Sequence, residues 1–355
     1  MNDEMTIRPA RLPSELCAIA AAWTESMPAS FEMSAARLDG YLTRDPNFDP
    51  DGCIGAFTPG GELAGFVIAK RWRIPNHDMA QDDATQWVRD GTGGIGMICV
   101  RPPFQRKGIG KRLVTAAEAF FKKNDVRVIS IGREPGRHLL PGVPQPLEDT
   151  LEFFDKLGYS SGFTTAIDIK GNISGIEAIP DTNTKLRDKI ATNRANGYDV
   201  ISYDPSMRDS LLDFMRVTFP GKWYWTVLSH VDAPDAPRDE LQVLVRKHGN
   251  KRQVLGFAHT STQAAIGLGP ATLVQSRGST EFGGLGPIGI ANDIRGSQGL
   301  GAMLLHHALV NLHRKGVNVV LIDWTSQGLL DRYYGLAGFT LYMTYISVKK
   351  ELPEA

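Results

Sequence analysis

An internal repeat constrains the fold of this chain more than any other feature. Each half has, in the same order, an apolar run typical of a buried strand, a glycine-rich loop, an amphipathic helical segment, a second apolar run and a short helical segment. In the first half these segments are 96–100, 105–110, 111–123, 126–131 and 151–159. In the second half they are 286–291, 295–301, 302–315, 317–324 and 329–339. The doubled order predicts two copies of one α/β domain, each with a mixed sheet flanked by helices.

Weaker similarities extend the repeat toward the start of each half. Each half opens on a short strand and a helix and continues with a hairpin-like pair of strands, at 6–9, 15–23, 53–57 and 63–69 in the first half and at 200–203, 207–217, 241–247 and 253–260 in the second. The chain has 355 residues, which suits two domains better than one core. We therefore expect domains at 1–170 and 198–355, joined by a linker at 171–197 whose polar part, 181–196, reads as a solvated helix.

Charge and cysteine content exclude several classes of protein. Lys plus Arg and Asp plus Glu both number 39, so no global basic field exists to hold nucleic acid or an anionic membrane. No apolar run approaches the length of a membrane span, and no signal peptide is evident at the start. Cys17, Cys53 and Cys99 show neither zinc spacing nor a disulfide framework, which suits the reducing cytosol. We expect a cytoplasmic protein with neither a nucleic-acid nor a membrane partner.

The two glycine loops have the properties of anion sites. Glycines let the backbone approach a ligand closely, and the unpaired amides at the start of the following helix point toward negative charge. The first loop lacks the Lys-Ser/Thr that a Walker loop needs, and Leu113 and Leu304 stand where a dinucleotide fingerprint needs its third glycine. The pattern Gln/Arg-x-x-Gly-x-Gly/Ala, in which backbone amides hold a pyrophosphate, fits Gln105-x-x-Gly108-x-Gly110 without adjustment.

These motifs resemble those of the GNAT acetyltransferase superfamily. The run from Val100 to Gly110 is similar to its acetyl-coenzyme A motif, and the Gly-aromatic ends, Gly158-Tyr159 and Gly338-Phe339, are similar to its last conserved block. The resemblance implies two tandem GNAT-like domains that use acetyl-CoA as cosubstrate and need no metal.

The resemblance also implies which residues contact acetyl-CoA. The strand before each loop would offer its main chain to the pantetheine arm, and the loop amides would hold the pyrophosphate. Carried over to this sequence, these positions are Ile98, Val100, Gln105, Arg106, Lys107, Gly108, Ile109 and Gly110 in the first half, and Ile288, Ile290, Arg295, Gly296, Gly299 and Gly301 in the second. Side chains 106 and 107 fit a solvated surface equally well. The second loop has one extra residue between positions 295 and 299.

Acetyl transfer to an amine needs a base to take a proton from the ammonium and an acid to protonate the departing thiolate. The resemblance assigns the acid to Tyr334 in the closing helix, where Phe154 stands in the first half and offers no proton. A buried core tyrosine is the alternative for Tyr334. Asp323, at the end of a strand, and Glu281, before the second binding strand, are candidate bases, although Asp323 could equally cap a turn.

Three further segments carry weaker predictions. His306 and His307 are adjacent on a helix and therefore face different directions, so we predict no metal site there. The proline- and glycine-rich passage 135–146 breaks the repeat in the first half, and loops of this size are often functional. The aromatic segment 219–225 fits either a substrate-facing loop or a core cluster.

The sequence thus predicts an N-acetyltransferase that moves acetyl from acetyl-CoA to a primary amine, most simply of a small molecule. We expect turnover in the second domain and a cofactor-holding role in the first, in a monomer or homodimer. The alternative is a non-catalytic acyl-CoA sensor or scaffold with degenerate domains.

Overall fold

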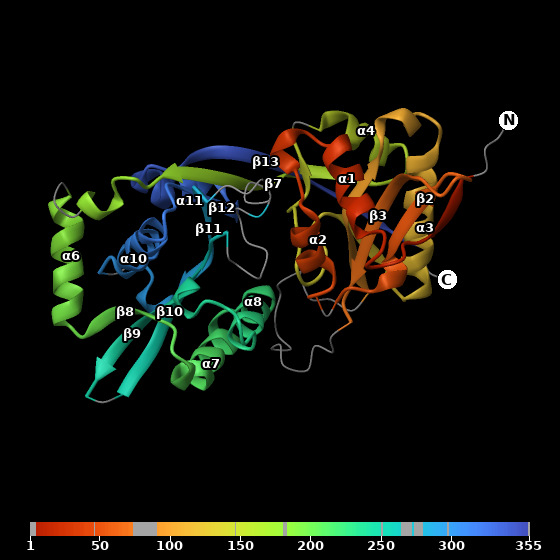
Figure 1. Cartoon of the computed structure of the whole chain (residues 1–355). Coiled ribbons are helices and arrows are strands. Elements are labelled where there is room, and N and C mark those ends of the chain that lie inside the picture. Colours follow the sequence, from red (N-terminus) through yellow and green to blue (C-terminus); the bar gives the residue numbers. More distant parts are fainter. Residues whose placement is uncertain are drawn as a thin grey trace. The chain divides into compact units, whose positions relative to one another are not determined.

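The fold consists of two compact units. The computed structural model describes residues 5–45, 47–73, 91–145, 147–179, 183–249, 251–263, 272, 280–296 and 298–353, with the backbone alone at 30, 148 and 163–165. Of these residues, unit 1 contains 5–73, 91–167 and 343–353, within the gaps just given, and unit 2 contains 168–342. Figure 1 labels the helices and strands of both units along the chain.

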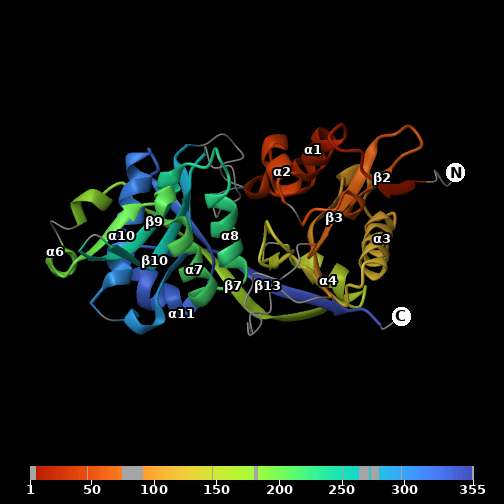
Figure 2. The ribbon, with the colours of Figure 1, turned by 90° about the horizontal axis from the view of Figure 1, so that it is seen from below.

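Unit 1 is a mixed sheet with helices on both of its faces. Its elements are β1 (Thr6–Pro9), α1 (Leu16–Ser26), α2 (Ala35–Leu42), β2 (Cys53–Phe57), β3 (Leu63–Arg71), β4 (Thr92–Val100), α3 (Ile109–Lys123), β5 (Val128–Ile131), β6 (Val143–Pro144), α4 (Glu148–Asp155) and the start of β7 (Ser160–Asn172). The strand order is β1-β2-β3-β4-β5-β13, where β13 is Thr340–Glu351, and among these pairs only β4–β5 is parallel. Figure 2 shows α1 and α2 on one face of this sheet and α3 and α4 on the other.

Helix α3 shows why the sequence folds this way locally. Its apolar residues recur at helical spacing, and Leu113, Val114, Ala117 and Phe121 are buried against the sheet, whereas Lys122 and Lys123 lie in its last turn, where they complement the helix dipole. This buried face of α3 joins β3, β4 and β5 in one hydrophobic core. The core fixes the start of α3, and with it the glycine loop, relative to the end of β4.

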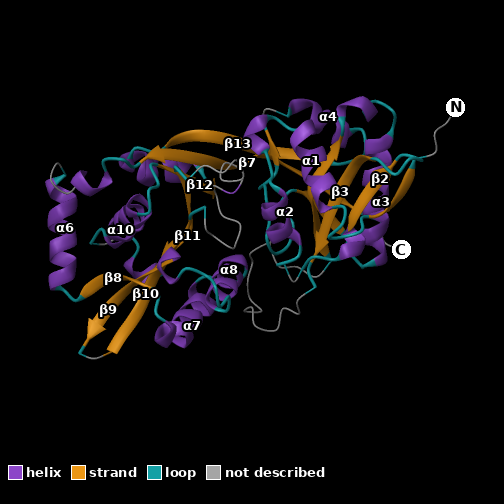
Figure 3. Cartoon of the chain, in the orientation of Figure 1, coloured by secondary structure: helices purple, strands orange, loops and turns teal. Residues whose placement is uncertain are grey.

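Unit 2 repeats the order of unit 1. Its elements are the end of β7, α6 (Thr184–Ala195), β8 (Tyr198–Ser202), α7 (Arg208–Thr218), α8 (Lys222–Val231), β9 (Leu241–His248), β10 (Lys251–Ser261), β11 (Phe282–Ile290), α10 (Leu300–Arg314), β12 (Val319–Thr325), α11 (Gln327–Leu329), a π-turn at Leu330–Tyr334 and β13 (Thr340–Glu351). The strand order is β7-β12-β11-β10-β9-β8, and the β11–β12 pair is parallel. Figure 3 separates these helices and strands by colour.

The mixed α/β fold and its duplication are confirmed, and the elements predicted for the repeat are present within a few residues. The segment predicted as a linker contains α6, which packs against α10. The aromatic segment 219–225 lies largely in α8, where Tyr224 and Trp225 are buried and Trp223 is 38 % exposed. It therefore belongs mainly to the core of unit 2.

The last strands depart from two consecutive domains. Residues 343–353 of β13 belong to unit 1, where Val348 to Glu351 pair antiparallel with β5. Strand β7 leaves unit 1 at residue 167 and enters unit 2 beside β12. The domain limits 1–170 and 198–355 do not include this contribution of the C-terminal strand to unit 1. No helix in the described part of the chain is long and apolar enough to cross a membrane.

Candidate functional site

Strands β4 and β5 of unit 1 part from each other partway along their length. Their parallel pairing runs from Thr92 to Ile95, and the amide of Gly132 then bonds the Ile95 carbonyl at 2.8 Å. Beyond this point β4 continues to Val100 and, among the described strands, is paired only with β3 on its other side. The main chain of 96–100 therefore presents one free edge, which is where the sequence placed the contacts of Ile98 and Val100 with a pantetheine arm.

The first glycine loop follows directly on this free edge. The Gln105 side-chain amide donates a hydrogen bond to the Val100 carbonyl at 2.8 Å and so ties the loop to the strand. Gly108 caps α3 with φ of 78°, in the left-handed region that favours glycine, and no atom lies within 4 Å of the position a Cβ would occupy there. A helix that begins at such a glycine leaves its first amides without partners inside the helix, which is the arrangement that anion sites use.

The other predicted contacts of the first loop fall into two groups. Ile109 is buried in the core, and Gly110 packs against the ring of Phe153, with 3.3 Å from a Cβ position to that ring. Arg106 and Lys107 are exposed, and the Lys107 ammonium donates to the Pro103 carbonyl at 3.0 Å. Backbone amides, rather than the two cationic side chains, thus form the centre of this cradle.

Unit 2 repeats the divergence and the loop. Strands β11 and β12 pair in parallel from Phe282 to Gly284, after which β11 continues to Ile290 beside β10, with which it pairs antiparallel. The Arg295 guanidinium donates to the Ile290 carbonyl at 3.3 Å, as Gln105 does in unit 1. Gly299 caps α10 with φ of 73°. Gly301, the second residue of α10, contacts Tyr333, whose hydroxyl donates to the Gly301 carbonyl at 2.7 Å.

The extra residue of the second loop is accommodated by left-handed backbone. Gly296 and Gln298 both have positive φ, 73° and 55°, while Ser297 between them lies outside the described residues. Helix α6 packs on this loop, because Asn193 donates to the Gln298 carbonyl at 3.0 Å and the Lys189 side chain lies 2.8 Å from a Cβ position at Gly299. The second loop is therefore covered by α6 and has a lysine beside it, whereas the first is open.

The closing segments of the two units have matching aromatic packing. In unit 1 the ring of Phe154 packs edge-on against Phe153 and Tyr159, with centroid distances of 5.1 and 5.2 Å. In unit 2 the Tyr334 ring packs in the same way against Tyr333 and Phe339, at 4.8 and 6.0 Å. Phe154 is fully buried and Tyr334 is 6 % exposed, so the tyrosine adds its hydroxyl to a packing arrangement that both units share.

The Tyr334 hydroxyl is available as a proton donor. Among the described residues it has no hydrogen-bond partner, and burial, followed by the charge of Asp323, raises the pKa of Tyr334 to about 12. Asp323 is half-buried at the end of β12, where burial raises its pKa and the nearby Lys222 ammonium opposes that rise. The charge of Asp323 therefore acts on Tyr334, and the pairing of the two as base and acid stays a prediction.

Glu281 lies elsewhere. It is exposed and directly precedes β11, at the end where β11 and β12 are still paired, and its backbone carbonyl accepts from Asn318 and Val319. It lies nine positions before Ile290 at the loop end of β11, which at about 3.3 Å a residue is a distance of about 30 Å. The base role of Glu281 stays a prediction.

A buried polar cluster in unit 1 was not predicted. Tyr41 of α2 donates to Oε1 of Glu134 at 2.6 Å, and the Leu139 amide donates to the same oxygen at 2.7 Å. Oε2 of Glu134 is buried and has no hydrogen-bond partner, and burial raises the pKa of this carboxyl, opposed by the Lys70 charge. Gly96, on the free edge of β4, lies against both side chains, with 2.6 Å from a Cβ position to Oε1. An incompletely bonded carboxyl thus lies beside the diverging strands.

Lys70 and Asp45 complete this cluster. The Lys70 ammonium bonds Asp45 at 3.1 Å, and the Tyr41 and Arg137 carbonyls at 2.9 and 2.8 Å. The loop residues 137 and 139 come from the passage 135–146, of which 146 lies outside the described residues. In the sequence, only the glycines at 93, 94 and 96 of β4 pointed to this cluster. They indicate that another group lies close to this strand, but not which group.

Unit 2 has a different polar pair near the corresponding place. His259 of β10 lies within 3.1 Å of His230 of α8, their rings packed edge-on at 4.8 Å. Burial lowers the pKa of His259 to about 3 and also lowers that of His230, so both rings are neutral near pH 7. No pattern in the sequence predicted this pair.

Comparisons with known proteins agree with this geometry. Residues 18–139 match the model of the acetyltransferase (GNAT) family. A search of curated proteins by sequence returned no match.

Among solved structures, a GCN5-related glucosamine N-acetyltransferase region of a fungal multi-domain GH3 β-N-acetylglucosaminidase is similar at TM-score 0.81 and 21 % identity. The match covers 99 % of this chain and 38 % of that one, so the chain spans well under half of that protein. A GCN5-related N-acetyltransferase from Sphaerobacter thermophilus is similar at TM-score 0.63 and 15 % identity, over 100 % of this chain and 98 % of that one. A tandem GNAT protein from the clavulanic acid biosynthesis pathway is similar at TM-score 0.61 and 16 % identity, over 99 % and 100 %.

Proposed function

We propose that this protein is an acetyl-CoA-dependent N-acetyltransferase acting on a primary amine, because residues 18–139 match the model of the acetyltransferase (GNAT) family and the fold occurs twice in the chain. The observation that carries the proposal is the same constellation in both units. Two parallel strands part after three or four residues, and the strand that runs on leads into a glycine loop capping a helix in left-handed conformation.

The residues present fit acetyl-CoA. The open space at Gly108 and the unpaired amides at the start of α3 suit a pyrophosphate, and the free edge at Ile98 and Val100 suits an amide-bearing pantetheine arm. In unit 2 the corresponding positions are Ile288, Ile290 and the loop at Gly299, and this loop is covered by α6 with the Lys189 side chain against it. Bound acetyl-CoA supplies the thioester whose acetyl group is transferred.

Proton movement distinguishes the two units. We assign the acid to Tyr334, because its phenol is protonated at neutral pH, has no other partner among the described residues and lies near Asp323. Asp323 is the proposed base in unit 2, with Lys222 favouring its charged form. Phe154 occupies the tyrosine position in unit 1 and donates no proton.

We therefore place turnover in unit 2 and a cofactor-holding role in unit 1. The inserted loop residue of unit 2 weighs against this, but its left-handed backbone accommodates the insertion and Lys189 adds a cation beside Gly299. The competing assignment places turnover in unit 1, with Glu134 as the base through its unpartnered Oε2.

An amino sugar is the first acceptor to test. The fungal neighbour is described as a glucosamine N-acetyltransferase region. The acceptor panel therefore begins with glucosamine and continues with an aminoglycoside, a polyamine, free amino acids and a peptide amine.

The experiment measures thiol release from acetyl-CoA by the full chain with this panel. Turnover with any amine supports the enzyme, and acetyl-CoA binding without turnover across the panel supports the sensor. Tyr334→Phe is expected to lower kcat by about 10²–10⁴-fold, the usual loss for a positioned acid. Tyr333→Phe is the matched control, because its hydroxyl bonds only the Gly301 carbonyl among the described residues.

A second pair of variants tests the assignment of units. Gly108→Val is expected to weaken cofactor binding at unit 1, and Gly61→Val controls for backbone strain, since Gly61 has φ of 84° and equally open surroundings in a hairpin turn. If Tyr334→Phe keeps most of the activity while Gly108→Val abolishes it, turnover lies in unit 1 and our assignment is wrong.

A further inference from the structure

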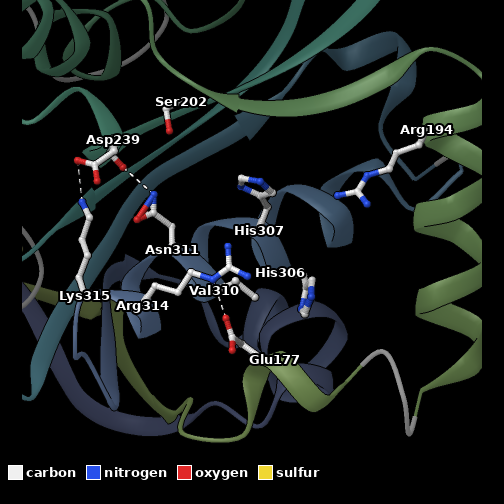
Figure 4. A pocket seen from close by; sticks show the side chains of 10 residues that line it. All are labelled: Glu177, Arg194, Ser202, Asp239, His306, His307, Val310, Asn311, Arg314 and Lys315. Carbon is white, nitrogen blue, oxygen red and sulfur yellow. Dashed lines mark hydrogen bonds and ion pairs between the residues drawn. The ribbon is translucent and has the colours of Figure 1, made fainter.

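A second pocket lies in unit 2, along α10 and away from the glycine loop. Its volume is about 590 Å³, in the range of small-molecule sites. Figure 4 shows its lining, which comes from α6, β8, α10 and the turns before β9 and α6: Glu177, Arg194, Ser202, Asp239, His306, His307, Val310, Asn311, Arg314 and Lys315. Polar and basic side chains dominate this lining.

Both acidic residues of the pocket are already paired. Glu177 accepts from the Arg314 guanidinium at 2.6 Å, and Asp239 bonds the Lys315 ammonium at 2.9 Å. The charges therefore cancel within each of these two pairs in the wall of the pocket. Arg194 forms no ion pair with any residue that the structure describes, so one positive charge is left over.

Two imidazoles share the pocket with this arginine. Nδ1 of His306 and Nδ1 of His307 are both buried and have no hydrogen-bond partner. In Figure 4 the Arg194 side chain extends from α6 toward these two residues on α10. Burial lowers the pKa of both histidines, and the Arg194 charge lowers it further. The pocket thus holds an unpaired cation and two unsatisfied ring nitrogens.

We propose that this pocket binds a small organic phosphate, whose phosphate group contacts Arg194, His306 and His307. A guanidinium offers a planar fork of donors that matches phosphate, and each neutral imidazole can donate one hydrogen bond to a further oxygen through Nε2, since its Nδ1 is buried. A phosphate monoester has three terminal oxygens for these three side chains, whereas a carboxylate has two. Ser202 and Asn311 supply hydrogen-bonding groups, and Val310 an apolar contact, for the rest of the ligand.

This site is separate from the cradle proposed for acetyl-CoA. His306 follows the first residue of α10 by six positions and Arg314 by fourteen, which at 1.5 Å a residue places them roughly 9 to 21 Å along the helix from its start. The helix α6 that carries Arg194 also contacts the second glycine loop through Asn193. The proposal does not depend on the proposed function, because binding is measured without turnover.

Calorimetric titration of the full chain in phosphate-free buffer tests the site. The probes are inorganic phosphate, glucose 6-phosphate, glucose and succinate. We expect the two phosphates to bind, glucose not to bind, and succinate to bind at least tenfold more weakly than glucose 6-phosphate. Equal binding of succinate would refute the phosphate assignment, and no binding of either phosphate at millimolar concentration would refute the site.

Variants on one helix locate the binding. Arg194→Gln is expected to weaken glucose 6-phosphate binding at least tenfold, as for loss of a charge-assisted hydrogen bond. Arg187→Gln, on the same helix and outside the pocket, is the matched control and should bind as the parent does. If Arg194→Gln also binds as the parent does, the site is elsewhere.

A competition separates this site from the cofactor cradle. The glucose 6-phosphate titration is repeated with coenzyme A at saturating concentration, and we expect its affinity to be unchanged. Displacement by coenzyme A would show that the pocket belongs to the cofactor site and would overturn the proposal.

Discussion

Replacing Lys70 by methionine tests the buried cluster of unit 1. The Lys70 side chain and its partner carboxylate, Asp45, are both fully buried, and the ammonium lies 3.5 Å from the centre of the Tyr41 ring. Methionine fills a similar volume and removes the charge. The substitution therefore leaves a buried carboxylate without its cation, together with two backbone carbonyls without their donor.

The size of the expected loss of unfolding free energy depends on the hydrogen bonds that Asp45 keeps in the variant. Breaking a buried ion pair by removing one partner usually costs about 3–5 kcal/mol. Asp45 still accepts the backbone amides of Asn47 and Arg137, at 2.9 and 2.7 Å, so we place the loss of unfolding free energy at the lower end, about 3 kcal/mol. Asp45→Asn added to Lys70→Met removes the uncompensated charge and should recover about 1 kcal/mol or more.

The assay is hydrogen exchange of the full chain, followed by mass spectrometry of peptides from α2 and β3. A loss of about 3 kcal/mol makes globally protected amides exchange roughly a hundredfold faster. Lys156→Met is the control, because Lys156 and Glu152 form an exposed pair, each side chain 68 % exposed, that contributes at most about 1 kcal/mol. Exchange in Lys70→Met within threefold of the parent, or a double variant no better protected than the single one, would refute the reasoning.

Three further variants address the two centres. Gly96→Ala should break the Tyr41–Glu134 hydrogen bond, because a Cβ there overlaps both side chains, and should destabilise unit 1 by about 1–3 kcal/mol in chemical denaturation. Burial raises the Glu134 pKa above its ordinary 4.5, so the unfolding free energy of the parent falls as pH rises from about 4.5 through the raised pKa. Glu134→Gln should not show this fall. Identical pH profiles of stability for parent and variant would contradict the burial argument. Phe154→Tyr should lower the unfolding free energy by about 1–3 kcal/mol without raising activity in the thiol-release assay, because the added hydroxyl is fully buried; a gain in activity would show that this position can serve as an acid.

The loops and the duplication could be predicted because their signals are local. A glycine that caps a helix in left-handed conformation, an apolar run and a helical spacing each occupy fewer than about fifteen consecutive residues. Gly108 and Gly299 carry this information in both halves, and the structure places each at the start of its helix. The sequence also indicated correctly that the two halves differ at Phe154 and Tyr334.

The Glu134 cluster and the strand exchange could not be predicted, because both are made by residues far apart in the chain. Tyr41 and Glu134 are 93 positions apart, and no local pattern links a tyrosine in one helix to a glutamate after a distant strand. The last strand reads as the end of the second repeat, yet its residues Val348 to Glu351 pair with β5 of unit 1. Either strand order satisfies the same apolar alternation, so periodicity alone does not decide between them.

The two units keep one backbone arrangement and differ in the groups that chemistry requires. In each unit an irregularity interrupts the strand before the glycine loop, opposite the 68/69 step of β3 in unit 1 and the 258/260 step of β10 in unit 2. Near the first lies the Tyr41–Glu134 pair, with an unpartnered carboxylate oxygen, and near the second lie two neutral histidines. The closing segments repeat their aromatic packing, but Phe153, Phe154 and Tyr159 of unit 1 correspond to Tyr333, Tyr334 and Phe339 of unit 2, so the hydroxyls lie at different positions. The two units thus share the backbone arrangement in which we propose that an acetyl donor binds, while the polar side chains near it differ. Equal activity in both units would therefore require two different sets of acids and bases on the same scaffold.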